Sequence, residues 1–174
     1  VPQVTVAVGC GAGRRAPLST AGIAARTCRT PVGRNPVLAG MKTLNRLEQV
    51  LARAEWQDED VAEGLMFDTD GQLVCGTMSN VFLVREQQLL TPLLDHCGVL
   101  GIMRAQVMAA AGRLGIPLAE TRLTLTSLQQ AEEVFVTNSQ IGIWPVTSLD
   151  GRPYVGKRLT ARLRAELARA GIAE

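Results

Sequence analysis

The stretch Gly40-Met41-Lys42-Thr43-Leu44-Asn45-Arg46-Leu47-Glu48-Gln49-Val50 is the part of the sequence around which the rest can be organised. Apolar residues then recur at three- and four-residue spacing, at Leu44, Leu47, Leu51 and Ala54. This spacing predicts an amphipathic helix that starts after Lys42 and ends near Trp56. Lys42 would therefore lie where a loop meets a fixed element.

Lys42 is one of only two lysines in a chain that contains sixteen arginines. Lysine is the cation whose charge a cavity removes most easily, and the free amine then forms Schiff bases or accepts protons. Taken alone, a lysine before a helix is more often a solvated surface group. The sequence of this segment leaves both interpretations open.

Composition limits the remaining possibilities. The 174 residues are sufficient for one well-buried domain or one domain with part of a second, and 47% of them are apolar. The net charge of +2 and the scattered arginines do not support nucleic-acid binding, and no apolar run is long enough to span a membrane. The four cysteines form no CxxC pair and there is one histidine, His96, so we expect no metal site and a cytoplasmic protein with reduced thiols.

The first third of the chain indicates two parts. Residues 4–8 alternate as in a strand, residues 9–15 form a glycine-rich basic loop, and residues 22–30 resemble a second short strand. The segment Pro31-Val-Gly-Arg-Asn-Pro36 has the composition of a linker. We expect residues 1–32 to be the remnant of a small N-terminal domain and its linker, and residues 33–174 to form a large domain. The chain begins with Val1, which suggests a fragment or a processed protein.

The remaining sequence alternates strand meanders with separated helices. Residues 64–68 and 72–76 flank a hairpin turn at Asp68-Thr-Asp-Gly71, and a further hairpin spans residues 80–91. Helices are predicted from Met103 to Leu114, after a cap at Thr126 or Ser127, and over about 157–170 with Leu159, Leu163 and Leu167 facing inward. Strands are predicted over residues 118–124 and 133–138, with residues 141–146 continuing the latter. This order predicts the α+β class with a mixed or largely antiparallel sheet and flanking helices.

Four ordered segments resemble the fold-type IV pyridoxal phosphate enzymes, which include branched-chain and D-amino-acid aminotransferases. The run from Asn35 to Val50 is similar to the active-site lysine segment of the aminodeoxychorismate lyase branch. The other three segments are Asp68-Thr-Asp-Gly71 leading to Ser79-Asn80-Val-Phe82, Gly98-Val-Leu-Gly-Ile-Met-Arg104, and Thr137-Asn-Ser-Gln-Ile-Gly-Ile-Trp-Pro-Val146. The resemblance covers about residues 22–170.

The resemblance implies pyridoxal 5'-phosphate as cofactor and Lys42 as the catalytic lysine that holds it. It assigns the cofactor phosphate to the backbone amides of Ile102 and Met103 and to Asn138 and Ser139. A loop running into a helix offers free N–H groups and a favourable dipole for such a group. Arg104 at the same helix start either adds positive charge or is a surface residue, and Arg46 either approaches the cofactor or is a solvated helix charge.

Two departures from the family pattern bear on activity. Most of the family's small N-terminal domain has no counterpart, and Cys75 stands where a glutamate normally faces the pyridine nitrogen of the cofactor. A thiol offers only a weak hydrogen bond there. The resemblance implies a homodimeric lyase that converts 4-amino-4-deoxychorismate to 4-aminobenzoate and pyruvate in folate biosynthesis, with activity impaired in this chain. The alternatives are a class IV aminotransferase and a catalytically silent homologue that still dimerises.

Overall fold

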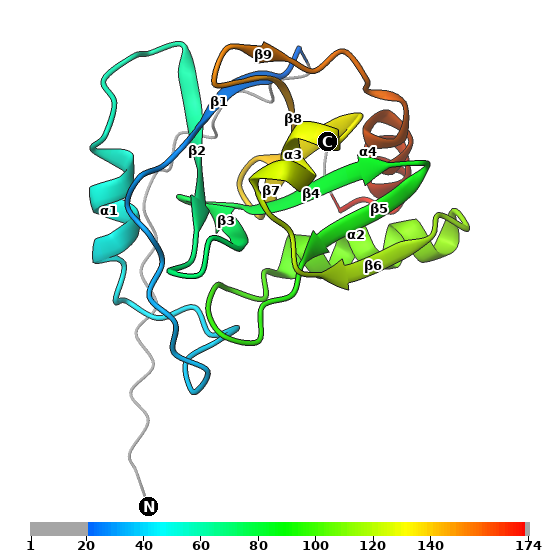
Figure 1. The fold of residues 1–174 in the computed structure, drawn as a ribbon. Helices are drawn as coiled ribbons and strands as arrows, with labels where there is room; N and C mark the ends of the chain where they lie inside the picture. The colour runs from blue at the N-terminus through cyan, green and yellow to red at the C-terminus, as the bar shows by residue number, and fades with distance from the viewer. Residues whose placement is uncertain (1–20, 173–174) are drawn as a thin grey trace, which may run out of the picture.

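The computed structural model describes residues 21–172 of the chain as one mixed sheet with four helices around it (Figure 1). The strands are β1 Ile23–Thr27, β2 Val61–Phe67, β3 Leu73–Gly76, β4 Asn80–Arg85, β5 Gln88–Pro92, β6 Leu118–Thr121, β7 Glu133–Asn138, β8 Gly142–Leu149 and β9 Arg152–Pro153. The helices are α1 Leu47–Arg53, α2 Ile102–Arg113, α3 Leu125–Gln130 and α4 Arg158–Arg169.

The sheet has the order β3-β2-β1-β8-β7-β4-β5-β6, and β9 pairs with β8. The pairs β1–β2, β1–β8 and β5–β6 are parallel, whereas the other pairs are antiparallel. The predicted α+β class with a mixed sheet is confirmed. Both predicted hairpins are present, and the Asp68 carboxylate accepts hydrogen bonds from the N–H groups of Asp70 and Gln72 across the first turn.

Both faces of the central strands are buried, because successive side chains of a strand point to opposite faces. In β4 and β7, Val81 and Val136 face one core, while Phe82 and Phe135 face the other. The two phenylalanines are paired across the strands and stack with ring centroids 5.0 Å apart. The sheet therefore separates two apolar cores.

Helices α2 and α4 lie side by side against the second of these cores (Figure 1). The predicted last helix is confirmed, with Leu159, Leu163 and Leu167 buried. Buried Glu133 at the start of β7 accepts hydrogen bonds from the N–H groups of Leu159 and Thr160, each at 2.8 Å. This contact caps the N-terminus of α4 and fixes the helix to the sheet. α3 contributes Leu128 to the first core.

The predicted helix after Lys42 is shorter than expected, because α1 begins only at Leu47. Gly40 pairs with Val99 instead, through hydrogen bonds from Gly40 N–H to the Gly98 carbonyl and from Leu100 N–H to the Gly40 carbonyl, both 3.0 Å. The prediction of the buried face was also wrong. Leu44, Leu47 and Leu51 are exposed, and α1 buries Gln49 and Ala52 against the sheet.

Two smaller predictions are corrected. The cap of α3 is Thr124, not Thr126 or Ser127, and it forms a reciprocal capping box in which Ser127 is the third helical residue. Residues 141–146 do not continue β7. They belong largely to β8, which turns back antiparallel to β7 after a tight connection.

The expected domain division at residue 32 would assign β1 to the N-terminal part. In the sheet, β1 lies between β2 and β8 and pairs with both. Residues 23–27 are thus part of the same sheet as the following elements. The strand expected at residues 4–8 and the loop at 9–15 lie outside the described residues.

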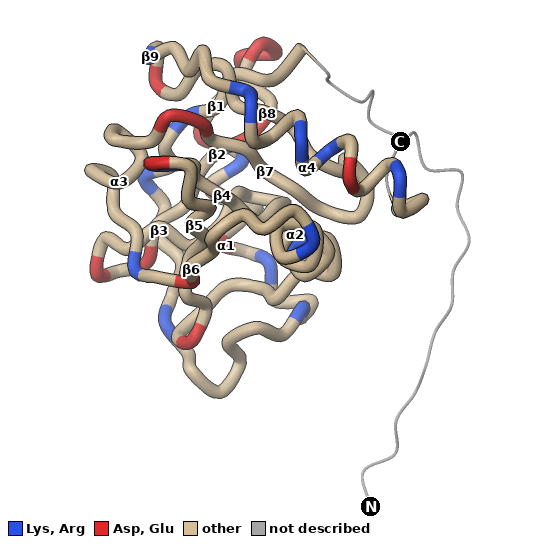
Figure 2. The backbone as a smooth tube through the Cα atoms, turned by 90° about the vertical axis from the view of Figure 1, so that its right-hand side faces the viewer, with Lys and Arg blue, Asp and Glu red and all other residues tan. Residues whose placement is uncertain are grey.

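Charges of both signs are interspersed along the described backbone, and basic residues recur along α4 (Figure 2). Within residues 21–172, no helix has both the length and the apolar character that crossing a membrane requires.

Candidate active site

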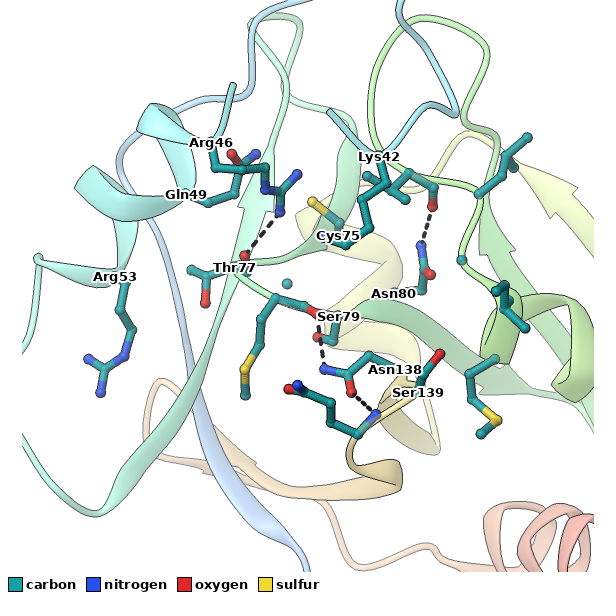
Figure 3. A pocket seen from close by; sticks show the side chains of 18 of the residues that line it. Lys42, Arg46, Gln49, Arg53, Cys75, Thr77, Ser79, Asn80, Asn138 and Ser139 are labelled. Atoms are coloured by element: carbon teal, nitrogen blue, oxygen red, sulfur yellow. Dashed lines mark hydrogen bonds between the residues drawn. The ribbon is translucent and has the colours of Figure 1, made fainter. Parts of the chain in front are cut away.

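A cavity of about 860 Å³ opens between α1, the 76–79 turn, the N-terminus of α2 and the turn after β7 (Figure 3). The residues predicted from the sequence to form the site all line it: Lys42, Cys75, Ile102, Met103, Asn138 and Ser139. These residues come from separate segments of the chain. Their convergence on one cavity is the main geometric finding.

Lys42 enters the cavity from the irregular segment before α1, and its side chain extends towards Cys75 (Figure 3). The backbone pairing of Gly40 with the 98–100 loop anchors this segment two residues before the lysine. Gly40 has a φ of +81°, a conformation that glycine adopts without steric cost. A flexible amine is therefore carried by a fixed backbone.

The N-terminus of α2 forms another wall. No side chain caps this helix, so the N–H groups of Ile102 and Met103 in its first turn are left for a ligand. Asn80 holds the preceding loop through a hydrogen bond from Nδ2 to the Val99 carbonyl, at 2.8 Å. A Cβ atom on Gly101 would clash with Asn80 Oδ1, so only glycine fits this approach to the helix.

The turn after β7 brings Asn138 and Ser139 to the same cavity. The Asn138 side chain is occupied within the protein, because Oδ1 accepts hydrogen bonds from the N–H groups of Gln140 and Ile141 and Nδ2 donates to the Met78 carbonyl. Asn138 therefore shapes the turn, and exposed Ser139 presents its hydroxyl at the cavity. The prediction that both contact a phosphate stays a prediction.

Arg104 does not belong to the cavity lining. Its side chain is buried on the other side of the helix start, where the guanidinium donates to Glu120 at 2.6 Å and to the Pro92 carbonyl at 3.1 Å. These contacts join α2 to β5 and β6. Arg104 is therefore neither a phosphate ligand nor a surface residue.

Cys75 is almost fully buried at the end of β3, with one side at the cavity. Burial raises the pKa of its thiol to about 12, the Arg46 guanidinium opposes that rise, and the Glu63 carboxylate adds to it. The thiol is therefore neutral near pH 7. It can donate only a weak hydrogen bond to a ligand.

Glu63, in the neighbouring strand β2, is fully buried and was not identified from the sequence. Its Oε1 accepts hydrogen bonds from the N–H groups of Gly64 and Thr77 and from the Thr77 hydroxyl, and its Oε2 accepts from the Ser79 hydroxyl at 2.6 Å. A buried carboxylate is stable only with such partners. Glu63 therefore fixes the 76–79 turn that forms the floor of the cavity.

Helix α1 and the residue before it supply three polar side chains that line the cavity, Arg46, Gln49 and Arg53. Their spacing of three and four residues places them on one helix face, a pattern that could have been recognised in the sequence. Arg46 donates from Nη2 to the Thr77 carbonyl at 3.3 Å. Arg46 is half-buried and lies in the cavity wall, so its approach to the cofactor stays a prediction.

Among the described residues, no group of three or more His, Cys, Asp or Glu side chains is arranged to hold a metal ion. The cavity instead combines a lysine, an uncapped helix N-terminus and a serine hydroxyl, carried by a mixed sheet with flanking helices. This is the arrangement of the fold-type IV pyridoxal phosphate enzymes.

The chain belongs to the amino-transferase class IV family, whose pattern it matches over residues 13–149. It is 35% identical to aminodeoxychorismate lyase of Vibrio harveyi over 151 residues, which cover 84% of this chain and 55% of the relative. It is 34% identical to D-alanine aminotransferase of Listeria monocytogenes over 126 residues, covering 71% of this chain and 43% of the relative.

Solved structures give the same grouping. The 4-amino-4-deoxychorismate lyase from Pseudomonas aeruginosa superposes with a TM-score of 0.81 at 46% identity, over 86% of this chain and 55% of that chain. The branched-chain aminotransferase from Thermoproteus uzoniensis superposes with a TM-score of 0.78 at 27% identity, over 88% of this chain and 52% of that chain. The chain thus spans about half the length of the relatives that it matches.

The cofactor of this family is pyridoxal 5'-phosphate, and the residues at the cavity fit it. The free N–H groups at the start of α2 and the Ser139 hydroxyl suit a phosphate, and Lys42 supplies the amine. The absence of a side chain at Gly101 lets the Asn80 side chain pack against the start of the helix. The neutral thiol of Cys75 fits least well, because the resemblance places it where a glutamate would face the ring nitrogen.

We expect Glu63→Gln to destabilise the chain by roughly 2–4 kcal/mol. The carboxylate accepts several buried hydrogen bonds, whereas the N–H groups of the new amide would face two of the same donors. Glu132→Gln is the matched control, since Glu132 is exposed and accepts one backbone hydrogen bond from Glu86. Urea denaturation of both variants measures the difference. Equal stability of the two variants would show that Glu63 does not hold the turn.

Proposed function

We propose that this chain is the part of an aminodeoxychorismate lyase that carries the cofactor-binding cavity, and that it takes part in converting 4-amino-4-deoxychorismate to 4-aminobenzoate and pyruvate. The observation that carries the proposal is the convergence of Lys42, the uncapped α2 N-terminus and Ser139 on one cavity. The similarity to two lyases supports it. The product makes the reaction a step of folate biosynthesis, for which we propose a cytoplasmic location.

Each residue has a defined task in this proposal. The amides of Ile102 and Met103, with the Ser139 hydroxyl, bind the phosphate and fix the ring in the cavity. Lys42 would hold the cofactor by Nζ, and the same Nζ, when free, would take a proton from the substrate ring. The buried thiol of Cys75 lies at the ring nitrogen, as the resemblance implies.

Pyridoxal 5'-phosphate, when bound, supplies an electron sink for the bond changes at the substrate. The two products together contain all atoms of 4-amino-4-deoxychorismate, so neither water nor an oxidant is consumed. Lys42 needs only to move a proton. Formation of an aromatic ring adds driving force that an amino transfer lacks.

An aminotransferase is the second candidate, because the chain is also similar to D-alanine and branched-chain aminotransferases. The two activities are separated by coupled detection of pyruvate from 4-amino-4-deoxychorismate against amino transfer to a 2-oxo acid. Pyruvate release without amino transfer supports the lyase. Amino transfer without pyruvate release would show an aminotransferase instead of a lyase. The absence of both activities would indicate a silent homologue.

We expect borohydride reduction in the presence of pyridoxal 5'-phosphate to fix the cofactor to Lys42, because Lys42 alone of the two lysines lines the cavity. Lys157 lies at the start of α4, outside the cavity lining, and donates from Nζ to the carbonyl of Ala21. Peptide mapping by mass spectrometry identifies the modified lysine. Lys157→Arg should keep the modification and Lys42→Arg should lose it, whereas modification of Lys157 would refute the assignment.

We expect Cys75→Glu to raise the lyase turnover rate by about tenfold, the factor that corresponds to the free energy of one charge-assisted hydrogen bond. The rate of amino transfer should rise by a larger factor. A carboxylate beside the ring nitrogen keeps it protonated and strengthens the electron sink, on which amino transfer depends more strongly. Cys75→Ser is the control, because it keeps a small neutral group there. Unchanged turnover in Cys75→Glu with normal cofactor binding would mean that another acid already serves the nitrogen.

We also propose that the chain forms a homodimer through large apolar side chains exposed on the Lys42 segment and α1. Met41, Leu44, Leu47 and Leu51 are 52–101% exposed and lie within eleven residues of the chain, and clustered exposed apolar side chains are typical of an interface. Leu44→Lys with Leu47→Lys should shift sedimentation from dimer to monomer. Val155→Lys, at an exposed apolar residue before α4, should leave it unchanged. A monomeric unmodified chain contradicts the proposal.

A further inference from the structure

The wall of the cavity formed by α1 is polar and positively charged. Arg46 and Arg53 line it together with Gln49, and no Asp or Glu is among the described residues of the cavity lining. Lys42 adds a third basic residue on a neighbouring wall. A cavity with this composition favours an anionic ligand.

Arg46 has unused hydrogen-bonding capacity. Among residues 21–172, its guanidinium makes one hydrogen bond, at 3.3 Å to the Thr77 carbonyl, and no carboxylate forms an ion pair with it. A guanidinium carries five N–H donors in a planar fork that matches a carboxylate. Arg46 therefore presents most of its donors to the cavity.

The position of Arg46 is held by a short chain of contacts. Thr77 is bound through its N–H and its hydroxyl to the buried Glu63 carboxylate, at 3.0 and 2.5 Å. The Thr77 carbonyl then accepts from Arg46. The guanidinium is thus directed by the floor of the cavity, and a directed donor group loses less freedom when a ligand binds.

Arg53 differs from Arg46 in that its guanidinium is already engaged. It lies over the Trp56 ring with 4.4 Å between the guanidinium carbon and the ring centroid, and it donates to the Trp56 carbonyl at 3.3 Å. These contacts hold the end of α1 to Trp56. Arg46 is accordingly the arginine of this wall that is left for a ligand.

Gln49 provides an independent observation. It is 8% exposed, it lines the cavity, and its Oε1 is buried without a hydrogen-bond partner. An unpartnered buried polar atom is costly and is usually satisfied by a ligand or water. The oxygen and nitrogen of a carboxamide have nearly the same shape, so this position can also present Nε2 as a donor.

Arg46 and Gln49 lie on the side of the cavity opposite Ser139 (Figure 3). The phosphate-binding groups proposed above are at the start of α2 and in the turn after β7, so Arg46 is not needed for the phosphate. Arg46 is therefore available to an anionic group other than the phosphate.

We propose that Arg46 and Gln49 form the subsite that binds a carboxylate of the substrate, with Arg46 donating through its fork and Gln49 donating from its carboxamide to the same group. This inference rests on the proposed function for the identity of the substrate, which carries two carboxylates. It assigns a substrate-binding role to a helix face that the phosphate and the lysine do not use.

The test measures the binding of matched acids and amides by isothermal titration calorimetry with pyridoxal 5'-phosphate present. 4-Aminobenzoate is compared with 4-aminobenzamide, which lacks the charge, and 4-methylvalerate with its amide. The variants are Arg46→Gln, Arg46→Lys and Gln49→Met, and Arg162→Gln is the control because Arg162 is exposed on α4 outside the cavity lining. Visible absorbance measures cofactor affinity separately.

We expect Arg46→Gln to lower the affinity for 4-aminobenzoate roughly 10- to 100-fold, the factor that corresponds to a charge-assisted hydrogen bond. The affinities for 4-aminobenzamide and for the cofactor should be unchanged. Arg46→Lys should lose less, because it keeps the charge without the fork. Gln49→Met should weaken the acid several-fold, and Arg162→Gln should bind like the unmodified chain.

The carboxylate subsite is overturned if the unmodified chain binds acids no better than amides, or if Arg46→Gln weakens acid and amide equally. A loss of cofactor affinity as large as the loss of acid affinity would also overturn it, since Arg46 would then serve the cofactor. Failure of the lyase proposal gives a different result. The chain would then prefer 4-methylvalerate to 4-aminobenzoate, and Arg46→Gln would still weaken that acid selectively.

Discussion

The buried carboxylate of Glu63 is the constraint on which the cavity depends. Removing a charged group from water is unfavourable unless hydrogen bonds replace its hydration, and here the donors come from Gly64 and from the 76–79 turn. The turn is shaped tightly around the carboxylate, because a Cβ on Gly76 would lie 2.6 Å from Oε2. Cys75 directly precedes this turn and Asn80 directly follows it. One buried charge therefore sets the placement of both ends of the connection between β3 and β4.

Asn80 also fixes the positions of the Lys42 segment and of the start of α2. Asn80 holds the Val99 carbonyl, and the same 98–100 loop pairs with Gly40 before it enters α2. The lysine segment and the uncapped helix are thus attached to one loop. The backbone before Lys42 and the first turn of α2 are therefore held by the same loop. A lysine on irregular backbone is in this way tied to a fixed position, as the proposed site requires.

Local signals in the sequence were sufficient for much of the fold. The Asp-Thr-Asp-Gly turn, the continuous apolar runs of β4 and β7 and the leucine spacing of α4 predict those elements correctly, because each pattern is contained in a few neighbouring residues. The six predicted site residues also line one cavity, although their contacts with a cofactor stay predictions. The leucines before and in α1 misled the prediction, because α1 begins only at Leu47 and both Leu44 and Leu47 are exposed. Glu63 was missed because a charged residue in a strand normally indicates a solvent-facing position, and only the distant 76–79 turn makes its burial possible.

The charges around the cavity favour the binding of anionic groups. Three basic side chains and a helix N-terminus line the cavity, and the described lining contains no carboxylate. Burial raises the pKa of the Cys75 thiol, so this thiol stays neutral. An additional carboxylate at residue 75 would partly neutralise Arg46, which is close enough to influence the pKa of that thiol. In the proposed lyase, a neutral thiol at residue 75 would be a weak partner for the ring nitrogen but would leave Arg46 its full charge for the proposed substrate carboxylate. Aromatisation supplies driving force in that reaction, so a weaker electron sink would be offset by stronger binding of the substrate anion.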